Sequence, residues 1–259
     1  MLNAIRYGFA SFLGFSKPVI FFLLAAFSAW GVIYLTKQGV AVTGKTLSIL
    51  GAQSVVMNAL VMFFISIPVA GQFSQEYRFK TLGATLLMVP HRLYLLISKT
   101  LFALIYVALA VGLLWGLIAG LSNFLGLTAT GVSYSFLAVT GANFSWNLSG
   151  LDSLLRILFY VFGYMLIVIS ISVLTKIQAL GVLIPMLYLL ILESIGAASD
   201  EAQKRGFIAN PIIPEWLRIF KAGQAWINGD TGAGLAFFSF SLVMFVISAF
   251  VFSKRSASA

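Results

Sequence analysis

Few residues in this chain have the types and spacing that catalysis or metal binding would require. The 259 residues include no cysteine and a single histidine, His91, which excludes disulfides, thiolate metal sites, cysteine nucleophiles and multi-histidine metal centres. A catalytic site needs a nucleophile, or an acid and a base, held in mutual reach, and the sequence offers no such constellation. We therefore predict no catalytic residues, no metal site, no cofactor-binding residues and no enzymatic activity for the chain itself.

A phosphate-binding pattern is matched at Gly39–Thr46, which reads GVAVTGKT and fits the P-loop consensus G-x-x-x-x-G-K-[ST]. A working P-loop lies between a buried strand and a helix, and a later Asp holds the metal ion. This segment instead follows a long apolar run, and the first acidic residue after it is Glu76. We interpret Gly39–Thr46 as a flexible turn outside the membrane.

The most strongly charged interruption between two apolar runs is the stretch Gln72–Lys99. Apolar residues between Leu82 and Val89 would give a helix here an apolar stripe, and Pro90 would end that helix. We predict a cytoplasmic helical region at 72–92 that lies against the membrane face and receives force from a partner protein. The ionisable residues of the stretch are Glu76, Arg78, Lys80, His91, Arg92 and Lys99.

The composition is that of an integral membrane protein. The chain is 61% hydrophobic and 9% charged, whereas soluble domains carry about a quarter charged residues. Too few polar groups are present to cover a globule in water. The net charge of +9 is explained by the Lys and Arg that accumulate in cytoplasmic loops of membrane proteins, so we expect a lipid bilayer as partner and no nucleic acid.

We predict an all-α integral membrane protein with six transmembrane helices in a single domain, 1–259. An apolar run of about 20 residues can cross the hydrocarbon core, and its backbone must be helical there because lipid offers no hydrogen-bond partners. Residues 1–16 are expected to form an amphipathic helix at the membrane surface. The predicted spans are 18–36, 47–69, 93–121, 154–174, 177–195 and 235–252.

The distribution of Lys and Arg predicts the orientation of the spans. Six crossings place both termini on one side. That side collects nine of the 16 Lys and Arg residues, opposed by Glu76, whereas the other side collects six that face six acidic residues. Because short cytoplasmic loops are enriched in Lys and Arg, both termini are predicted to be cytoplasmic.

Two short external helices are predicted within 196–234, between the fifth and sixth spans. Ser199 is placed to cap the first of them, and Gly206 to end it in the C′ position. Pro214 is suited to the first turn of the second helix, which is expected to stop at Gly223.

Small and polar residues mark two candidate faces within the spans. Gly112, Gly116 and Gly120 are spaced four apart in the third span, which favours close packing with another helix. Ser54 and Asn58 share a face of the second span, and Asn58 lies deep enough to need a polar partner. Helix packing and pathway lining both remain open for these residues.

The charged stretch resembles a family signature. Residues 74–101, SQEYRFKTLGATLLMVPHRLYLLISKTL, resemble the segment between the second and third spans of type-2 ABC transporter permeases, and 213–226, IPEWLRIFKAGQAW, resembles a later segment of that family. The chain departs from the pattern at Phe79-Lys80, where a small residue is common, at Pro90, which lies one residue nearer the Arg, and in the uncharged loop 122–150. The family pattern is occupied by Glu76, Arg78, Thr81, Leu86, Leu87, Pro90, Arg92 and Lys99.

The resemblance implies the permease subunit of an exporter in the cytoplasmic membrane of a prokaryote. Two such permeases, identical or paired with a paralogue, would form the pathway, and each would bind a separate ATP-binding cassette ATPase that holds ATP and Mg. Arg92 and Lys99 would reach acidic ATPase surface or lipid headgroups. Polysaccharide, lipid, peptide and drug exporters share this plan, so the substrate stays open. The coupling residues it implies are Glu76, Tyr77, Arg78, Thr81, Pro90, Arg92 and Lys99.

The sequence also bears on three alternative functions. An ion-driven secondary transporter would place ionisable residues at the centre of its spans, and often shows internal repeats, neither of which is visible. An intramembrane enzyme lacks its catalytic constellation. A non-transporting scaffold or sensor subunit of a larger complex fits the same sequence and stays an alternative.

Overall fold

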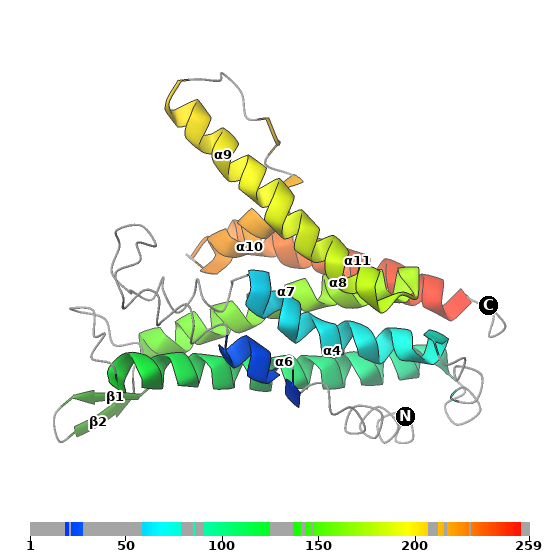
Figure 1. Ribbon diagram of the computed structural model, residues 1–259, viewed down its shortest axis with the longest axis horizontal. Coiled ribbons are helices and arrows are strands. Elements are labelled where there is room, and N and C mark those ends of the chain that lie inside the picture. The colour runs from blue at the N-terminus through cyan, green and yellow to red at the C-terminus, as the bar shows by residue number, and fades with distance from the viewer. Residues whose placement is uncertain are drawn as a thin grey trace.

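The computed structural model describes the chain in segments, which are helical apart from one hairpin and short connections. Figure 1 shows the long helices side by side along one axis. The described residues are 19–20, 22–27, 59–78, 85, 91–124, 137–140, 143–146, 148–206, 212–214, 217–227 and 229–254.

Three helices in the described part are long and apolar enough to cross a membrane. They are α6 (Arg92–Phe124), α7 (Leu148–Thr175) and α11 (Thr231–Lys254). They correspond to the predicted third, fourth and sixth spans, because a long apolar run can satisfy its backbone in lipid only as a helix. At 1.5 Å per residue, the 33 residues of α6 extend about 50 Å, well beyond the hydrocarbon core.

Two shorter apolar helices complete the bundle. The first, α4 (Ala59–Arg78), continues nine residues past the predicted end of the second span at Val69. The second, α8 (Gln178–Leu187), lies where the fifth span was predicted and runs through a π-helical segment, η1 (Tyr188–Leu192). Of the predicted first span, residues 19–20 and 22–27 are helical, and the remainder with the expected surface helix 1–16 lies outside the described residues.

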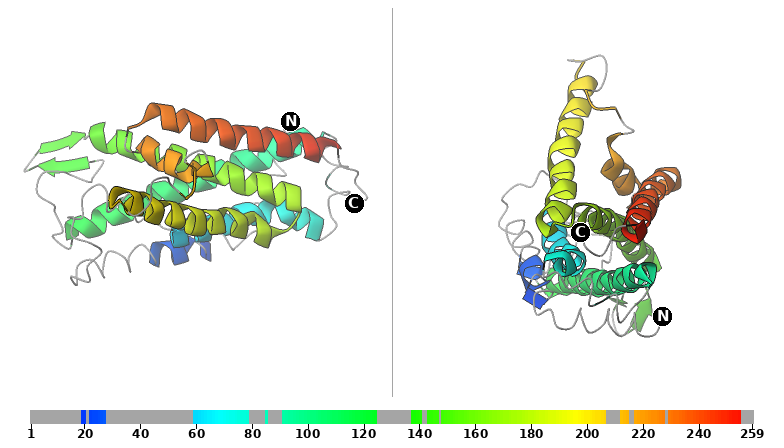
Figure 2. Two further views of the ribbon diagram at one scale, coloured as in Figure 1. Left: turned by 90° about the horizontal axis from the view of Figure 1, so that it is seen from above. Right: turned by 90° about the vertical axis from the view of Figure 1, so that its right-hand side faces the viewer.

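The polar segment after the fifth span differs from the prediction. Helix α9 (Glu193–Lys204) is continuous with η1 and begins six residues before Ser199, so the predicted N-cap at Ser199 is wrong. The predicted end at Gly206 is confirmed, since this glycine has φ +75 and its N–H bonds to Gln203 O at 3.0 Å. Figures 1 and 2 show α9 leaving the bundle at an angle.

Helix α10 (Ile219–Ile227) also differs from the expected second external helix. It starts five residues after Pro214 and passes through Gly223, where a stop was expected. Gly223 is buried against the ring of Tyr160, a close approach that a side chain would prevent. Its lack of a Cβ therefore serves packing between α10 and α7 and does not end the helix.

Within the predicted uncharged loop 122–150, the described residues form a short antiparallel hairpin. Strand β1 (Leu137–Thr140) pairs with β2 (Asn143–Trp146), with Leu137 opposite Trp146. The end of α6 and the start of α7 take up further residues of this loop.

Helix α7 forms the core of the bundle and packs against α4, α6, α8, α10 and α11. A Cβ at Gly163 would overlap the Phe237 ring of α11, and one at Gly181 of α8 would overlap the Ser172 hydroxyl of α7. These glycines set close helix crossings. The outward faces of α6, α8, η1 and α11 expose large apolar side chains, as expected where lipid is the solvent. Examples are Leu101, Leu109, Leu113, Leu187, Ile191, Leu242, Val246 and Phe250.

Candidate functional site

The predicted coupling region is bounded by the end of α4 and the start of α6, at the end of the bundle on the right in Figure 1. We call this the basic end, defined by the described cationic side chains Arg92, Lys176 and Lys254 together with His91. Glu76 and Arg78 are placed by the backbone of the last turns of α4. Thr81, Pro90, Ser54 and Asn58 lie outside the described residues.

Lys99 joins α6 to α4. Its side chain is 3% exposed, and Nζ donates a hydrogen bond to Gln72 O at 2.8 Å. A bond from an ammonium group to a carbonyl is stronger than one between neutral groups. The burial of Lys99 leaves Arg92, which is partly exposed, as the one of this pair whose side chain reaches the surface.

Tyr77 joins α4 to two further elements. Its ring packs edge-on against Phe252 of α11, with centroids 6.5 Å apart and an interplanar angle of 87°. The Lys176 ammonium, from the turn between α7 and α8, lies 5.5 Å from the Tyr77 ring centroid. A cation within about 6 Å of a ring face is attracted to it. We call Tyr77, Lys176 and Phe252 the Tyr77 node, where three elements distant in sequence meet.

The turn between α7 and α8 is sharp and is attached to α4 a second time. Lys176 has φ +63, the left-handed region that few residues other than glycine adopt. Its N–H donates to Ser172 O at 2.9 Å, which closes the last turn of α7. Gln178 Nε2 then donates to Ile67 O of α4 at 3.0 Å. The predicted spans leave a short break at 175–176. The sequence gives no sign of either contact, because no local pattern pairs Lys176 or Gln178 with α4.

The glycine ridge predicted in the third span has no close neighbour at its described member. A Cβ at Gly112 would meet no described atom within 4 Å. For Gly116 and Gly120 the structure gives the helical backbone alone. The ridge therefore stays a prediction.

Comparison with known proteins gives no match. No protein-family model matches it, and no similar curated protein or solved structure was found. What the basic end can do follows from its geometry alone. Among the described residues, the contacts at this end fasten helix ends to one another.

Proposed function

We propose that this chain is the membrane-spanning permease subunit of an ATP-binding cassette exporter. A separate ATPase subunit would bind the region 72–92 from the cytoplasm, and a second copy or a paralogue would complete the pathway. One observation carries the proposal: both flanks of the coupling region are fastened, α4 to the α7–α8 turn at Tyr77 and α6 to α4 at Lys99.

Fastening of this kind is what force transfer needs. A displacement applied between α4 and α6 would be absorbed if the flanking helix ends moved freely. Here a movement of α4 also displaces the α7–α8 turn, through Lys176 and Gln178, and the end of α11, through Phe252. In the proposal, ATP-driven closure of two ATPase subunits therefore moves several spans together.

The charge of the basic end supports its assignment to the cytoplasm. Over the whole sequence, nine of the 16 Lys and Arg residues are assigned to the side of this end and six to the other side. Lys and Arg are enriched on the cytoplasmic side of membrane proteins, so both termini are proposed to be cytoplasmic.

Six spans remain part of the proposal. The helices α6, α7 and α11 would supply three of them, and α4 and α8 with η1 would supply two more. The helical residues 19–20 and 22–27 would belong to the first span. ATP and Mg would be bound by the partner ATPase, which would carry its own P-loop.

The proposal is tested by purifying the tagged chain in mild detergent and identifying the proteins that accompany it. We expect an ATPase chain with a P-loop, and ATP hydrolysis by the purified complex. Replacing 79–90 with a Gly/Ser linker should remove that chain. A matched replacement of 125–136, also 12 residues, should leave it bound. Purification alone, or with partners that lack nucleotide-binding motifs, would favour a scaffold or sensor subunit and refute the proposal.

A further inference from the structure

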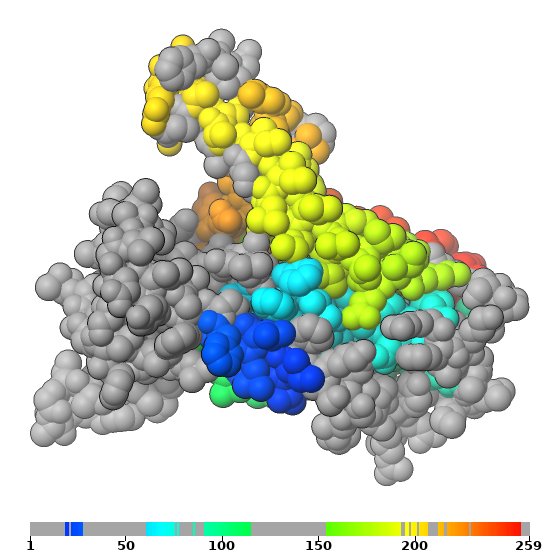
Figure 3. Space-filling view, in the orientation of Figure 1, coloured from blue at the N-terminus to red at the C-terminus, as the bar shows by residue number. Residues whose placement is uncertain are grey.

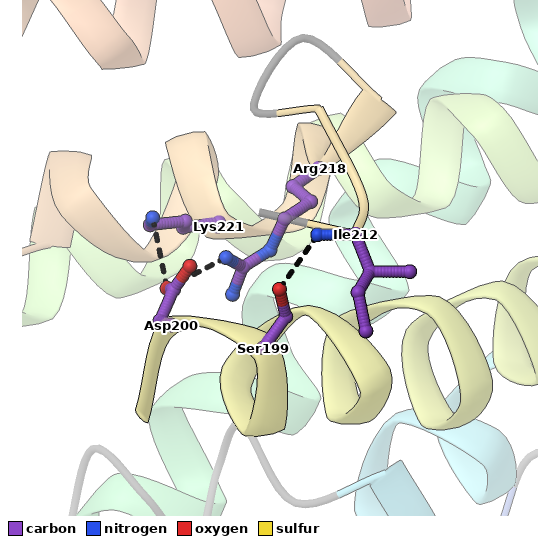
Figure 4. Close-up of polar contacts among 5 residues, drawn as sticks. All are labelled: Ser199, Asp200, Ile212, Arg218 and Lys221. Atoms are coloured by element: carbon purple, nitrogen blue, oxygen red, sulfur yellow. Dashed lines mark hydrogen bonds and ion pairs between the residues drawn. The ribbon is translucent and has the colours of Figure 1, made fainter. Parts of the chain in front are cut away.

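A cluster of polar side chains holds α9 against the start of α10 (Figure 4). Asp200 Oδ2 accepts hydrogen bonds from Arg218 Nη1 at 2.7 Å and from Lys221 Nζ at 3.2 Å. One residue earlier on α9, Ser199 Oγ accepts a hydrogen bond from Ile212 N at 2.8 Å. The cluster therefore ties α9 both to the start of α10 and to the chain that leads into it.

The cluster is built around a buried guanidinium. Arg218 is 5% exposed, whereas the Asp200 side chain is 30% exposed. The guanidinium lies directly over Gly196, where a Cβ would overlap Nε of Arg218. The Arg218 hydrogen bond, with a further one from Lys221, holds the pKa of Asp200 below its usual value. Gly196 of α9 thus leaves room for the Arg218 guanidinium, and Asp200 of α9 pairs with its charge.

Helix α9 depends on this cluster for its position. It projects away from the bundle in the ribbon and space-filling views (Figures 1 and 3). Its sequence, ESIGAASDEAQK, has too few apolar residues to form a lipid-facing or core-facing stripe. A helix with little apolar packing is held by its ends and by specific polar contacts.

A natural hinge lies at the other end of α9. The five residues of η1 are π-helical, none of them is buried, and Pro185 precedes them in α8. Proline removes a helical N–H, and π-helical turns mark bends in otherwise regular helices. At the junction the Tyr188 N–H is shared between the carbonyls of Ile184 and Pro185. The first two residues of η1, Tyr188 and Leu189, pack against the core, with the Tyr188 and Phe220 ring centroids 5.4 Å apart. The bend can therefore change beyond them, at residues 190–192, without disturbing the core.

Helix α10, in contrast, is fixed to the bundle. Arg156 Nη1 of α7 donates to Trp226 O at 3.2 Å, and Trp226 Nε1 donates back to Arg156 O at 3.1 Å. The Arg156 guanidinium also lies 5.1 Å from the centroid of the Trp226 ring. On its inner face, Phe220 packs against Tyr164 and Phe237. If one of these two helices moves relative to the other, it is therefore α9.

We propose that Asp200, Arg218 and Lys221 form a latch that holds α9 on α10, with η1 as its hinge. When the latch opens, α9 swings as one unit while α7, α10 and α11 stay in place. The device needs no ligand and is independent of the function proposed above. A contact that merely stabilises the fold would instead loosen the whole bundle when removed.

Hydrogen–deuterium exchange of the full chain in lipid nanodiscs distinguishes the two cases. Asp200→Asn removes the charge of the latch, and Gly196→Ala opens it by displacing the Arg218 guanidinium. Both should raise amide exchange across 189–206 by about tenfold or more, with α7 and α11 changed less than about twofold. The matched control, Asp230→Asn, alters another acid at the same end of the bundle and should leave α9 unchanged.

A distance measurement shows whether α9 swings or merely unwinds. The chain contains no cysteine, so spin labels can be placed on Lys204→Cys and Gln224→Cys, two exposed positions on α9 and α10. Opening of the latch by Gly196→Ala should shift or broaden the distance between the labels while α9 stays helical. Unchanged distances and exchange in both latch variants would overturn the proposal, as would faster exchange spread equally over α7 and α11.

Discussion

The Tyr77 node makes a quantitative prediction about how the ends of the helices are held together. Tyr77→Leu removes the ring that contacts Phe252 and the Lys176 ammonium. Lys176→Asn removes the ammonium and adds no backbone strain, because Asn tolerates the left-handed conformation of this position better than most residues. Combining the two changes gives a double-mutant cycle in which the effect of Asn on the backbone cancels.

The size of the effect follows from the two ring contacts. An edge-to-face aromatic pair contributes about 0.5–1.5 kcal/mol beyond area burial. A cation over a ring contributes about 0.5–1 kcal/mol at an exposed site and about 2 kcal/mol when desolvated, and Lys176 is partly buried. Tyr77→Leu should therefore lower the free energy of unfolding by about 1–3 kcal/mol, with about 1 kcal/mol of coupling between positions 77 and 176.

The assay is unfolding of the purified chain in mixed micelles by titration with SDS, followed by tryptophan fluorescence. Tyr77→Phe is the matched control, because it keeps the ring and both ring contacts and should lie close to the unmodified chain. A coupling energy below about 0.3 kcal/mol would lie within the error of additive, independent sites. That result would refute the view that the α7–α8 turn is fastened to α4 through Tyr77.

Three further predictions concern packing, the α7–α10 contact and pH. Gly181→Ala should destabilise the chain by about 1–3 kcal/mol in the same titration, because the added methyl group overpacks the crossing of α7 and α8. Gly112→Ala should stabilise it by about 0.5–1 kcal/mol, because its methyl group meets no described atom. Equal effects of the two changes would contradict the close crossing of α7 and α8. Arg156→Met should lower the free energy of unfolding by about 1–3 kcal/mol, because it removes the cation over Trp226 and one hydrogen bond. An unchanged unfolding midpoint would contradict a stabilising contact between α7 and α10 at this point. The pKa of Asp200 is lowered in the folded chain, so the ionised carboxylate holds α9 fully above pH 3.8 and stops holding it as the pH falls through the lower pKa of the folded chain. The distance between labels on α9 and α10 should therefore stay constant from pH 7 to pH 5. Its distribution should broaden only in stronger acid.

The sequence predicts the long helices well because the bilayer leaves few alternatives. Runs such as 154–174 and 235–252 carry no charge apart from Arg156 near one end. Each is about as long as the hydrocarbon core is thick, and a helix is the one way to satisfy its backbone there. Both are helical in the structure. At the end of α9, Gly206 was equally predictable, since a left-handed residue that ends a helix is most often glycine.

The polar segment after η1 shows where local signals fail. Ser199 and the acids that follow it look like a helix start, yet α9 begins earlier because it continues from α8. The Ser199 hydroxyl accepts a hydrogen bond from Ile212 N, a residue of the returning chain, and does not cap its own helix. Gly223 likewise looks like a helix end, but it lies inside α10 and packs directly against the Tyr160 ring. Cap residues have short-range signals, and tertiary contacts can use the same side chains differently.

The candidate site itself was only partly predictable. The charged stretch 72–99 could be found because charge is rare in this chain. The contacts that fasten it could not, since Tyr77, Lys176 and Phe252 lie far apart in sequence and no periodic pattern joins them. Lys99 was expected at a surface, but a long apolar stem lets its ammonium reach the Gln72 carbonyl between two helices.

The central claim, that an ATPase subunit binds at the basic end, is tested most directly by site-specific photo-crosslinking in cells. A photoreactive residue would replace His91, which is exposed at the basic end, or Gln224, which is exposed on α10 at the opposite end. Mass spectrometry of the crosslinked products then identifies the neighbours of each position. The account predicts a P-loop ATPase crosslinked at position 91 and absent at position 224. Crosslinks at position 91 to lipid alone, or an ATPase crosslinked only at position 224, would contradict it.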